Sequence, residues 1–392
     1  MNPAHKNILK LTLIFLAAFY ASGTPCQSQE ICMPERWHTS LVDVKPLFCE
    51  DTLTIVVLGD IMMHQSQIDA AAEGSSYDFG TYFSLIGDRI ADADLAVANM
   101  EFTLGGEPYT GYPCFSAPDE FADYLAECGF DIFLTANNHI FDKGSIGAER
   151  TLGIYRKMEA AHGIKFTGLA SDASDMERNN PLIIRRKGIS VAFVNATYGT
   201  NMGNHGAWPQ TNLLNDEKRM EEALAKAKEN RVTMTLVLPH WGAEYQLIHS
   251  PVQEKRALWL AEHGADMIIG SHPHVIQDFR MIPAENGEKL VPTAYSLGNA
   301  VSNMSARDTQ LELMATIRIA RGKNGDCAVL PLEFTYLWCS RPGGFGDSYT
   351  VIPVEDYIGR RDEWAGPWDY DKMIATYDRV REITGIKDIK DI

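Results

Sequence analysis

The sequence has few cysteines, and none of the seven has the close, paired spacing of a zinc finger. A metal site built on thiolates is therefore not expected. The count is odd, so at least one cysteine is free or bonded outside the chain if the others pair. Two groups are candidates for disulfides: Cys327 with Cys339, and the N-terminal set Cys26, Cys32 and Cys49.

Basic residues are outnumbered by acidic ones. The chain has 35 Lys and Arg against 52 Asp and Glu, which gives a formal net charge of −17. A nucleic-acid-binding protein usually has a basic surface, so no nucleic-acid partner is expected. An anionic substrate is still compatible with this charge if metal ions hold it, because a bound cation outweighs the field of the whole protein locally.

Long apolar runs are also missing, apart from a short one at residues 11–21 that follows two lysines. This pattern is typical of a secretion signal, and the run is too short for a comfortable membrane span. We expect a signal peptide over residues 1–25 and an exported protein of the periplasm or cell envelope. An uncleaved anchor is one alternative. Lipid attachment at Cys26 is another, and Pro25 disfavours it because a small residue is expected there.

The length of 392 residues suits one large α/β domain with additions. The sequence has no internal repeat and no low-complexity segment. We expect an extended segment over residues 26–51, a main domain over 52–340, and a C-terminal loop and helix over 341–392 that pack on the main domain.

Short apolar runs without helical spacing alternate with helical patterns along the main domain. Such runs predict strands that are buried on both faces, and the alternation predicts an α/β fold. The predicted buried strands are residues 53–58, 95–98, 132–135, 232–238 and 265–269. Helices are predicted at 82–91, 119–128, 148–162, 215–230, 252–263 and 369–384, and antiparallel strands at 310–320 and 327–338.

The most informative stretch follows the strand at 265–269, where Gly270 is succeeded by Ser271, His272, Pro273 and His274. Ligands bind at the carboxyl ends of strands in open α/β sheets. Pro273 stiffens the loop between the two imidazoles. Two histidines held in this way suit a transition metal, although the pair alone fits a surface loop equally well.

The other buried strands end in the same manner. Asp60, Glu101, Asn138, His139 and His240 each follow such a strand within a few residues. Each residue alone has an ordinary structural explanation, such as a helix cap, a turn or a core histidine. Together they predict one crevice with mixed oxygen and nitrogen ligands, which suits one or two divalent ions of Mn, Fe or Zn.

The ordered motifs GDIMMH, ANMEF, NNH, HWGAEY, GSHPHV and YSLGN resemble the CapA family, also called the poly-γ-glutamate capsule proteins. That family is related to the calcineurin-like metallophosphatases. The resemblance extends from about Leu53 to Val301. It implies a four-layer α/β/β/α sandwich of the metallo-dependent phosphatase type, with the site where the strand ends meet.

The resemblance also implies a role for each matching residue. The implied metal ligands are Asp60, Glu101, Asn138, His240, His272 and His274, and His139 would protonate the leaving group or stabilise the transition state. Two departures from the phosphatase pattern stand out. Met62 replaces a ligand histidine, with His64 two residues further on, and Glu101 replaces a shorter bridging aspartate. The site is therefore dinuclear, mononuclear or empty of metal on this comparison.

Three further charged residues follow the motifs. Glu244 in HWGAEY is a candidate partner of a ligand histidine or an extra catalytic base, and an ordinary surface carboxylate is an equal alternative. Lys143 and Arg280 are candidates for binding a substrate carboxylate or phosphate. Solvated surface charges are the more common role of such residues.

Two functions follow from these expectations. The first is a metal-dependent hydrolase or transferase that acts on a phosphoester or on a γ-glutamyl or peptide-like amide. The second is a non-catalytic envelope protein that binds, tethers or exports an anionic capsular polymer together with capsule-synthesis partners. Met62 favours the second function, whereas the paired histidines and His139 favour the first.

Overall fold

The computed structural model describes residues 49–203, 206–284 and 287–388. The predicted signal peptide, Cys26 and Cys32 lie outside these residues, as does nearly all of the predicted extended segment at 26–51. Within the described part of the chain, no helix combines the length and apolar character that crossing a membrane requires.

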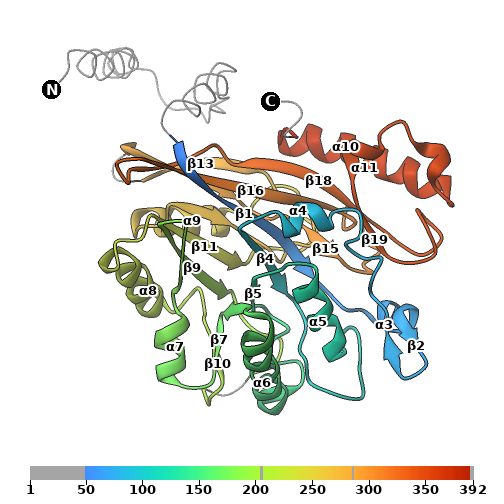
Figure 1. The fold of residues 1–392 in the computed structure, drawn as a ribbon, viewed down its shortest axis with the longest axis horizontal. Helices are drawn as coiled ribbons and strands as arrows, with labels where there is room; N and C mark the ends of the chain where they lie inside the picture. Colours follow the sequence, from blue (N-terminus) through green and yellow to red (C-terminus); the bar gives the residue numbers. More distant parts are fainter. Residues whose placement is uncertain (1–48, 204–205, 285–286, 389–392) are drawn as a thin grey trace. The chain divides into compact units, whose positions relative to one another are not determined.

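Two β-sheets form the centre of the described chain (Figure 1). The first contains, in spatial order, β19 (Thr350–Pro353), β18 (Glu333–Ser340), β16 (Leu311–Gly322), β1 (Cys49–Ile61), β4 (Leu95–Met100), β5 (Ile132–Leu134) and β6 (Lys165–Thr167). The strands from β1 to β6 run parallel, and β16, β18 and β19 continue the sheet in antiparallel fashion. Two short strands extend it: β15 (Asn299–Val301) pairs with the end of β1, and β17 (Cys327–Val329) pairs with β16.

The second sheet contains, in spatial order, β13 (Phe279–Ala284), β14 (Lys289–Ala294), β12 (Met267–Ile269), β11 (Met234–His240), β9 (Ile189–Thr197) and β8 (Leu182–Arg186). Its inner strands run parallel, and the outer strands β13 and β8 are antiparallel to their neighbours. Two small pairs lie outside both sheets: β2 (Ala72–Glu73) with β3 (Ser76–Tyr77), and β7 (Leu169–Ala170) with β10 (Gln210–Thr211).

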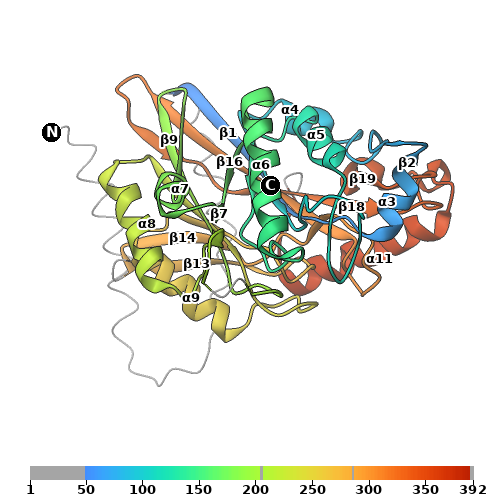
Figure 2. The same ribbon diagram turned by 90° about the horizontal axis from the view of Figure 1, so that it is seen from below.

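The helices are α3 (Gln65–Ala71), α4 (Gly87–Ala91), α5 (Asp119–Glu127), α6 (Gly144–His162), α7 (Ala173–Asn179), α8 (Glu217–Glu229), α9 (Pro251–Glu262), α10 (Val354–Tyr357) and α11 (Pro367–Thr384), with a 3-10 turn η4 (Arg361–Glu363). In Figures 1 and 2, α5 and α6 lie on one side of the sheets. The helices α8 and α9 accompany the strands of the second sheet (Figure 2).

Alternating side chains of the strands fill three separate cores. In β1, Ile55 and Val57 pack between the two sheets, while Val56 and Leu58 pack against α3 to α6. A third core joins the second sheet to α8 and α9. This alternation follows from the two-residue period of a strand that is covered on both faces. The layers are therefore α/β/β/α, and the predicted fold class is confirmed.

The C-terminal segment is part of the core between the sheets. Met373, Tyr377 and Val380 of α11 are buried there together with Trp338 of β18. The carboxylate of Asp369 accepts hydrogen bonds from Nε1 of Trp338 at 3.2 Å and from the hydroxyl of Ser340 at 2.6 Å. The helix thus covers the antiparallel end of the first sheet.

The structure corrects three local predictions. The strand predicted at 327–338 is two strands, β17 and β18, and both pair with β16. Cys327 lies opposite Arg321 of β16, whereas Trp338, which precedes Cys339, lies opposite Leu311. Arg321 and Leu311 are about 30 Å apart along β16. The proposed Cys327–Cys339 bridge is therefore wrong, and both thiols are free. The helix predicted at 82–91 is reduced to α4, because turns occupy its first half.

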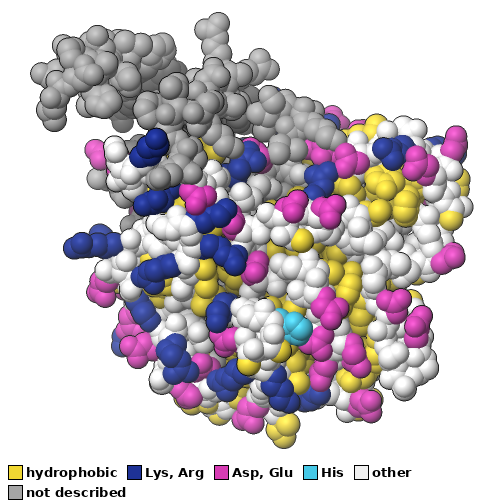
Figure 3. Space-filling view, viewed as in Figure 1, with side chains coloured by type: hydrophobic (Ala, Val, Ile, Leu, Met, Phe, Trp, Pro, Cys, Tyr) yellow, Lys and Arg dark blue, Asp and Glu magenta, His cyan; other side chains and the backbone are white. Residues whose placement is uncertain are grey.

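Charged side chains are unevenly distributed over the face shown in Figure 3. Lys and Arg gather on the side of α7 and α8, and Asp and Glu gather on the side of α3 and α5. The formal charge of −17 is therefore not spread evenly over the surface. The charge that a ligand meets therefore depends on the side chains around its own binding site rather than on the net charge of the chain.

Candidate metal centre

The carboxyl ends of the parallel strands in both sheets meet at one crevice. The first sheet contributes residues from the ends of β1, β4 and β5, and the second contributes residues from the ends of β11 and β12. The structure brings together seven predicted site residues there, all at most 4 % exposed: Asp60, Glu101, Asn138, His139, His240, His272 and His274. Their positions in the sequence are far apart, so the sheet topology alone makes them neighbours.

Two glycines allow the close approach of backbones on which this arrangement depends. A Cβ on Gly59 would lie 2.0 Å from the carbonyl oxygen of Gly298, and a Cβ on Gly270 would lie 2.2 Å from that of Tyr295. The backbone N–H of Asp60 donates to the Gly298 carbonyl at 2.9 Å. Glycine is required at both positions because any side chain would push apart strands that carry ligands.

The loop with the two neighbouring histidines is held in an unusual conformation. His272 and His274 have φ angles of 98° and 58°, in the left-handed region that side chains other than glycine rarely adopt. The backbone N–H of His272 donates to Oδ2 of Asp60 at 3.0 Å. This bond joins the second sheet to the first and helps to maintain the strained loop, as is common at functional sites.

Glu101 is shared by two groups of candidate metal ligands. One group is Glu101, His240 and His272, and the other is Asp60, Glu101 and His274, with the ligand atoms of each group within 4.8 Å of one another. Oε1 of Glu101 lies 3.6 Å from Nε2 of His240 and 3.8 Å from Nε2 of His274. A carboxylate in this position can contribute to two cation sites at once.

The electrostatics of the cluster favour a bound cation. Both carboxylate oxygens of Glu101 and Nδ1 of His272 are buried without a hydrogen-bond partner in the described chain. Burial and the neighbouring charge of Asp60 raise the pKa of Glu101 well above its usual value. Burial lowers the pKa of His240, and it lowers the pKa of His272 to about 3. A bound divalent cation would stabilise the ionised form of Glu101, and the neutral imidazoles complete a mixed set of nitrogen and oxygen ligands.

Three polar residues that the sequence prediction did not single out orient the ligands. Nδ2 of Asn99 donates to Oδ1 of Asp60 at 2.7 Å. Oδ1 of Asn299 lies 3.0 Å from Nδ1 of His274, and Oγ of Ser271 lies 3.0 Å from Nδ1 of His240. Such contacts fix the ring orientation and tautomer of a ligand histidine. All three residues lie within the motifs already noted, but only the fold shows which ligand each one contacts.

His139 lies beside the cluster with its imidazole fixed. Its Nδ1 is 2.7 Å from Oδ2 of Asp142, and its Nε2 is 3.9 Å from Oε1 of Glu101. The ring of Phe115 packs edge-on against the imidazole at 4.7 Å. Asn138 contacts the second sheet, because its Oδ1 is 2.7 Å from Nε2 of His240. The Asp142 contact leaves Nε2 of His139 directed at the cluster.

The two residues near the altered phosphatase motif occupy different environments. Met62 is 2 % exposed and packs in the core beneath α3 to α6. His64 caps α3, and its Nδ1 accepts a hydrogen bond from the backbone N–H of Asn303 at 3.2 Å. In the described chain, neither residue belongs to the two groups that share Glu101.

The remaining predicted site residues lie outside the cluster. Glu244 is exposed, and within the described residues it belongs to neither group of candidate ligands. Nζ of Lys143 donates to Oγ1 of Thr110 at 2.7 Å. Arg280 is exposed and pairs with Asp278 at 2.9 Å. Within the described residues, the structure does not bring Lys143 or Arg280 into contact with the candidate ligands.

Two exposed tyrosines flank the cluster, and the sequence analysis did not identify them. The ring of Tyr198 lies 4.6 Å from that of His272, and the ring of Tyr245 lies 6.3 Å from that of His274. The loop at 199–203, which follows Tyr198, also touches the site, because the N–H of Asn201 donates to the carbonyl of Asn138 at 2.8 Å. Both aromatic rings therefore lie between the cluster and the solvent-exposed surface.

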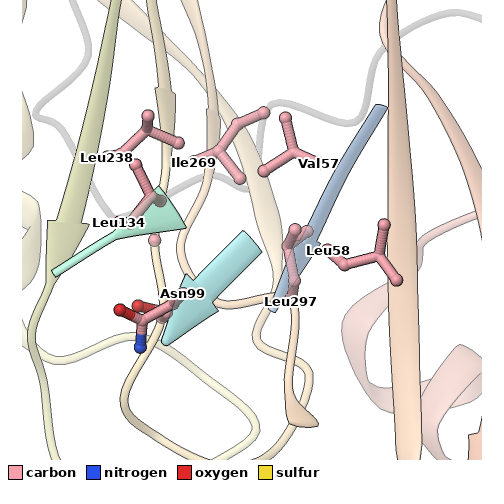
Figure 4. A pocket seen from close by; sticks show the side chains of 9 residues that line it. Val57, Leu58, Asn99, Leu134, Leu238, Ile269 and Leu297 are labelled. Carbon is pink, nitrogen blue, oxygen red and sulfur yellow. The ribbon is translucent and has the colours of Figure 1, made fainter. Parts of the chain in front are cut away.

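The space between the sheets next to the cluster is almost completely filled. A void of about 10 Å³ remains, and it is lined by Val57, Leu58, Asn99, Leu134, Leu238, Ile269, Gly270, Ser271 and Leu297. Figure 4 shows Leu238, Ile269 and Val57 on one side of this void and the amide of Asn99 on the other. Such a volume holds about one water molecule at most. The side chains between the sheets next to the cluster are therefore closely packed and mostly apolar.

Residues 54–304 match the model of a family described as bacterial capsule synthesis protein PGA_cap. The capsule biosynthesis protein CapA of Bacillus anthracis is 26 % identical over 299 residues, which cover 72 % of this chain and 68 % of the relative. The PGA biosynthesis protein CapA of Bacillus subtilis (strain 168) is 24 % identical over 297 residues, which cover 73 % of each chain.

Solved structures with a similar fold include the NAD nucleotidase of Haemophilus influenzae, with a TM-score of 0.44 and 11 % identity. The 5'-nucleotidase precursor of Thermus thermophilus has a TM-score of 0.43 and 14 % identity. Each similarity covers 85 % of this chain, and the chain spans about three fifths of the length of each of these proteins.

Proposed function

Because the chain belongs to the PGA_cap family of bacterial capsule synthesis proteins, we propose that it is an exported, metal-dependent hydrolase or transferase of capsule metabolism. The proposed substrates are a phosphoester or a γ-glutamyl or peptide-like amide. One curated relative is named a PGA biosynthesis protein, and this name supports the γ-glutamyl amide. Export is proposed from the N-terminal sequence pattern at residues 1–25.

The single observation that carries this proposal is the environment of Glu101. Its carboxylate is fully buried, has no hydrogen-bond partner in the described chain, and is shared by two groups of ligand residues. A buried carboxylate without a partner is costly, and bound cations remove that cost. Two groups of ligands that share one carboxylate favour metal-dependent chemistry on the substrate.

Six residues would hold the metal: Asp60, Glu101, Asn138, His240, His272 and His274. When bound, divalent cations activate water and polarise the oxo group of the substrate. Asn99, Ser271 and Asn299 keep the ligand side chains in place through the contacts given above. The side chains beneath the cluster are closely packed, and the ring of Tyr198 lies 4.6 Å from that of His272.

His139 is the proposed proton donor to the leaving group. Its Nδ1 is engaged by Asp142, so the proton that the substrate receives comes from Nε2. Asp142 is a positioning residue, because it contacts His139 and keeps the imidazole in one tautomer and one orientation. Glu244 is exposed, and its role as a partner of a ligand histidine or as an extra base stays a prediction.

The experiment is an activity assay of purified protein with p-nitrophenyl phosphate and γ-glutamyl-p-nitroanilide. The protein is stripped with EDTA and then supplied with Mn²⁺, Zn²⁺ or Fe²⁺. We expect cleavage of at least one substrate that depends on added metal and is lost in a His272→Ala/His274→Ala variant. The matched control is His162→Ala/His263→Ala, which removes two exposed histidines.

A metal-loaded protein that cleaves neither substrate, and that also fails with longer γ-glutamyl chains, would contradict the proposal. The alternative function, binding or tethering of an anionic capsular polymer in the envelope, would then account for the fold and for family membership.

A further inference from the structure

A groove of about 400 Å³ lies beside the metal-ligand cluster and is not part of it. Its lining comes from three separate parts of the chain, namely the segment before α9, the segment before β16, and α11. The lining residues are Tyr245, Gln246, Leu247, Ile248, Arg307, Asp308, Arg379 and Ile383.

One wall of the groove is continuous with the loop that carries the paired histidines. The backbone N–H of Tyr245 donates to the carbonyl of Pro273 at 2.9 Å, and the Tyr245 ring lies next to that of His274. A group bound in the groove therefore lies close to the cluster.

This wall is held in place by buried polar contacts. Nε2 of Gln277 donates to the carbonyl of Gln246 at 2.9 Å, and the N–H of Asp278 donates to the carbonyl of Leu247 at 3.2 Å. The carboxylate of Asp278 also binds the ring of His249 at 2.9 Å. The wall is thus preorganised, which lowers the entropic cost of binding.

The opposite wall carries two guanidinium groups but only one carboxylate. Arg379 forms an ion pair with Asp308. Arg307 is exposed, and its side chain has no hydrogen bond or ion pair with another described residue. Burial lowers the pKa of Arg379, and the nearby charge of Arg307 lowers it further. The two cations are therefore close enough to repel each other. The groove is a locally positive site in a chain with a formal charge of −17.

The groove also exposes apolar surface. Tyr245, Ile248 and Ile383 are 43 %, 46 % and 43 % exposed, and all three line the groove. Clustered exposed apolar side chains mark binding surfaces, and an apolar pocket with a few polar groups suits a small organic ligand. A ligand that satisfies both features has an anionic end and a short aliphatic part.

We propose that the groove binds a carboxylate on a short aliphatic arm of the substrate, next to the unit whose bond is cleaved at the metal cluster. This inference rests on the proposed function and specifies its substrate as a chain with repeated carboxylates. Arg307 provides a planar, bidentate donor for the carboxylate, while Arg379, paired with Asp308, lies beside it in the groove. Both arginines lie outside residues 54–304, so the family match alone assigns them no role.

The test is isothermal titration of metal-loaded full-length protein with γ-linked tetraglutamate, in a His139→Ala background that prevents turnover. Arg307→Ala is expected to weaken binding by about ten-fold or more, the usual effect of losing a charge-assisted hydrogen bond. Ile383→Asn is expected to weaken it as well. Arg185→Ala removes an exposed charge from β8 and is the matched control, with no change expected.

Two ligand controls define the chemistry. The tetraglutamate analogue with carboxamide side chains is expected to bind about ten-fold more weakly than the acid, and inorganic phosphate is expected not to compete. Equal loss in Arg307→Ala and Arg185→Ala would show a non-specific charge effect and overturn the inference. Unchanged binding in Arg307→Ala, or competition by phosphate that depends on Arg307, would also overturn it.

These outcomes are separate from those of the proposed function. Binding that depends on Arg307 in a protein without hydrolytic activity would support the groove and contradict the hydrolase. Hydrolysis of γ-linked tetraglutamate with the same KM in wild type and Arg307→Ala would support the hydrolase and contradict the groove. Metal content measured in parallel shows that Arg307→Ala leaves the cluster intact.

Discussion

Nε2 of His240 lies 3.6 Å from Oε1 of Glu101, although His240 ends a strand of the second sheet and Glu101 follows a strand of the first. The contact shows that the two sheets converge at their carboxyl ends on one buried carboxylate. A single side chain from the first sheet thus faces imidazoles from two strand ends of the second.

Substitution of Gly59 tests whether the close packing of strands positions the cluster. Gly59→Ala is expected to destabilise the protein by about 2–3 kcal/mol or to prevent folding, because the new Cβ would meet the Gly298 carbonyl at 2.0 Å. Gly153→Ala is the matched control. Gly153 lies within α6 with no atom near its added Cβ, so a stabilisation of about 0.5–1 kcal/mol is expected. Urea denaturation measures both changes, and equal effects would contradict the account.

Removal of Asn299 tests the support of a ligand histidine. Asn299→Ala deletes the amide oxygen that lies 3.0 Å from Nδ1 of His274, and metal affinity is expected to fall by roughly 10- to 100-fold. Asn230→Ala at the exposed end of α8 is the control, and it should leave the affinity unchanged. Competition with a chromophoric chelator gives the affinity. A variant that retains wild-type affinity would show that Asn299 does not orient His274.

Asp142→Asn tests the positioning of His139. The change removes the charge 2.7 Å from Nδ1 of His139 while it keeps an acceptor in place. We expect kcat to fall by roughly 10- to 100-fold with little change in KM, and the pH profile of kcat to shift. Metal content should stay at the wild-type value, and Asp123→Asn on the exposed face of α5 should behave as wild type. Loss of metal from Asp142→Asn would assign Asp142 a structural role in the cluster instead.

Asp369→Ala tests how firmly the C-terminal helix is anchored. The substitution leaves Nε1 of Trp338 and the hydroxyl of Ser340 without their common acceptor, in a buried position. We expect a loss of about 2–4 kcal/mol in the free energy of unfolding. Asp371→Ala breaks only the exposed ion pair with Arg361 and should cost at most about 1 kcal/mol. A similar, small loss in the free energy of unfolding for both variants would show that the buried contacts of Asp369 contribute little to the anchoring of α11.

The sequence allowed the fold and the cluster to be predicted because the same physical feature encodes both. A strand covered on both faces must be apolar along its length, so runs such as residues 53–58 and 232–238 are visible, and the polar residue after each run is conspicuous. Since parallel strands end at one edge, Asp60 and His240 were expected to meet, and they do lie close to each other.

Other features depend on contacts between distant segments that leave no local pattern. Tyr198 and Tyr245 approach the histidines only because their loops fold over the strand ends. Arg307 and Arg379 share a groove through the packing of α11. Conversely, Lys143 and Arg280 follow site motifs in the sequence, yet their side chains pair with Thr110 and Asp278. Proximity in sequence to a motif is therefore a weak guide to membership of the site.

Local signals were also overridden by tertiary contacts. Asp119 follows Pro118 at the start of α5, a typical position for a capping aspartate, but Pro118 occupies the capping position, and Asp119 forms a bidentate ion pair with Arg150 at 2.7 and 2.8 Å. The predicted Cys327–Cys339 bridge failed because the two strands pair with opposite ends of β16. In both cases a contact with another element, Arg150 of α6 or the strand β16, decides the local structure.

The most direct test of the account is the metal stoichiometry of purified protein, measured by inductively coupled plasma mass spectrometry after reconstitution with Mn²⁺, Zn²⁺ or Fe²⁺. We expect about two equivalents in the wild type and in Glu244→Gln, and less than one in Glu101→Gln, because Glu101 is shared by both groups of ligands. Equal metal content in Glu101→Gln and wild type, or no metal in the wild type after reconstitution, would contradict the central claim that Glu101 joins two metal sites.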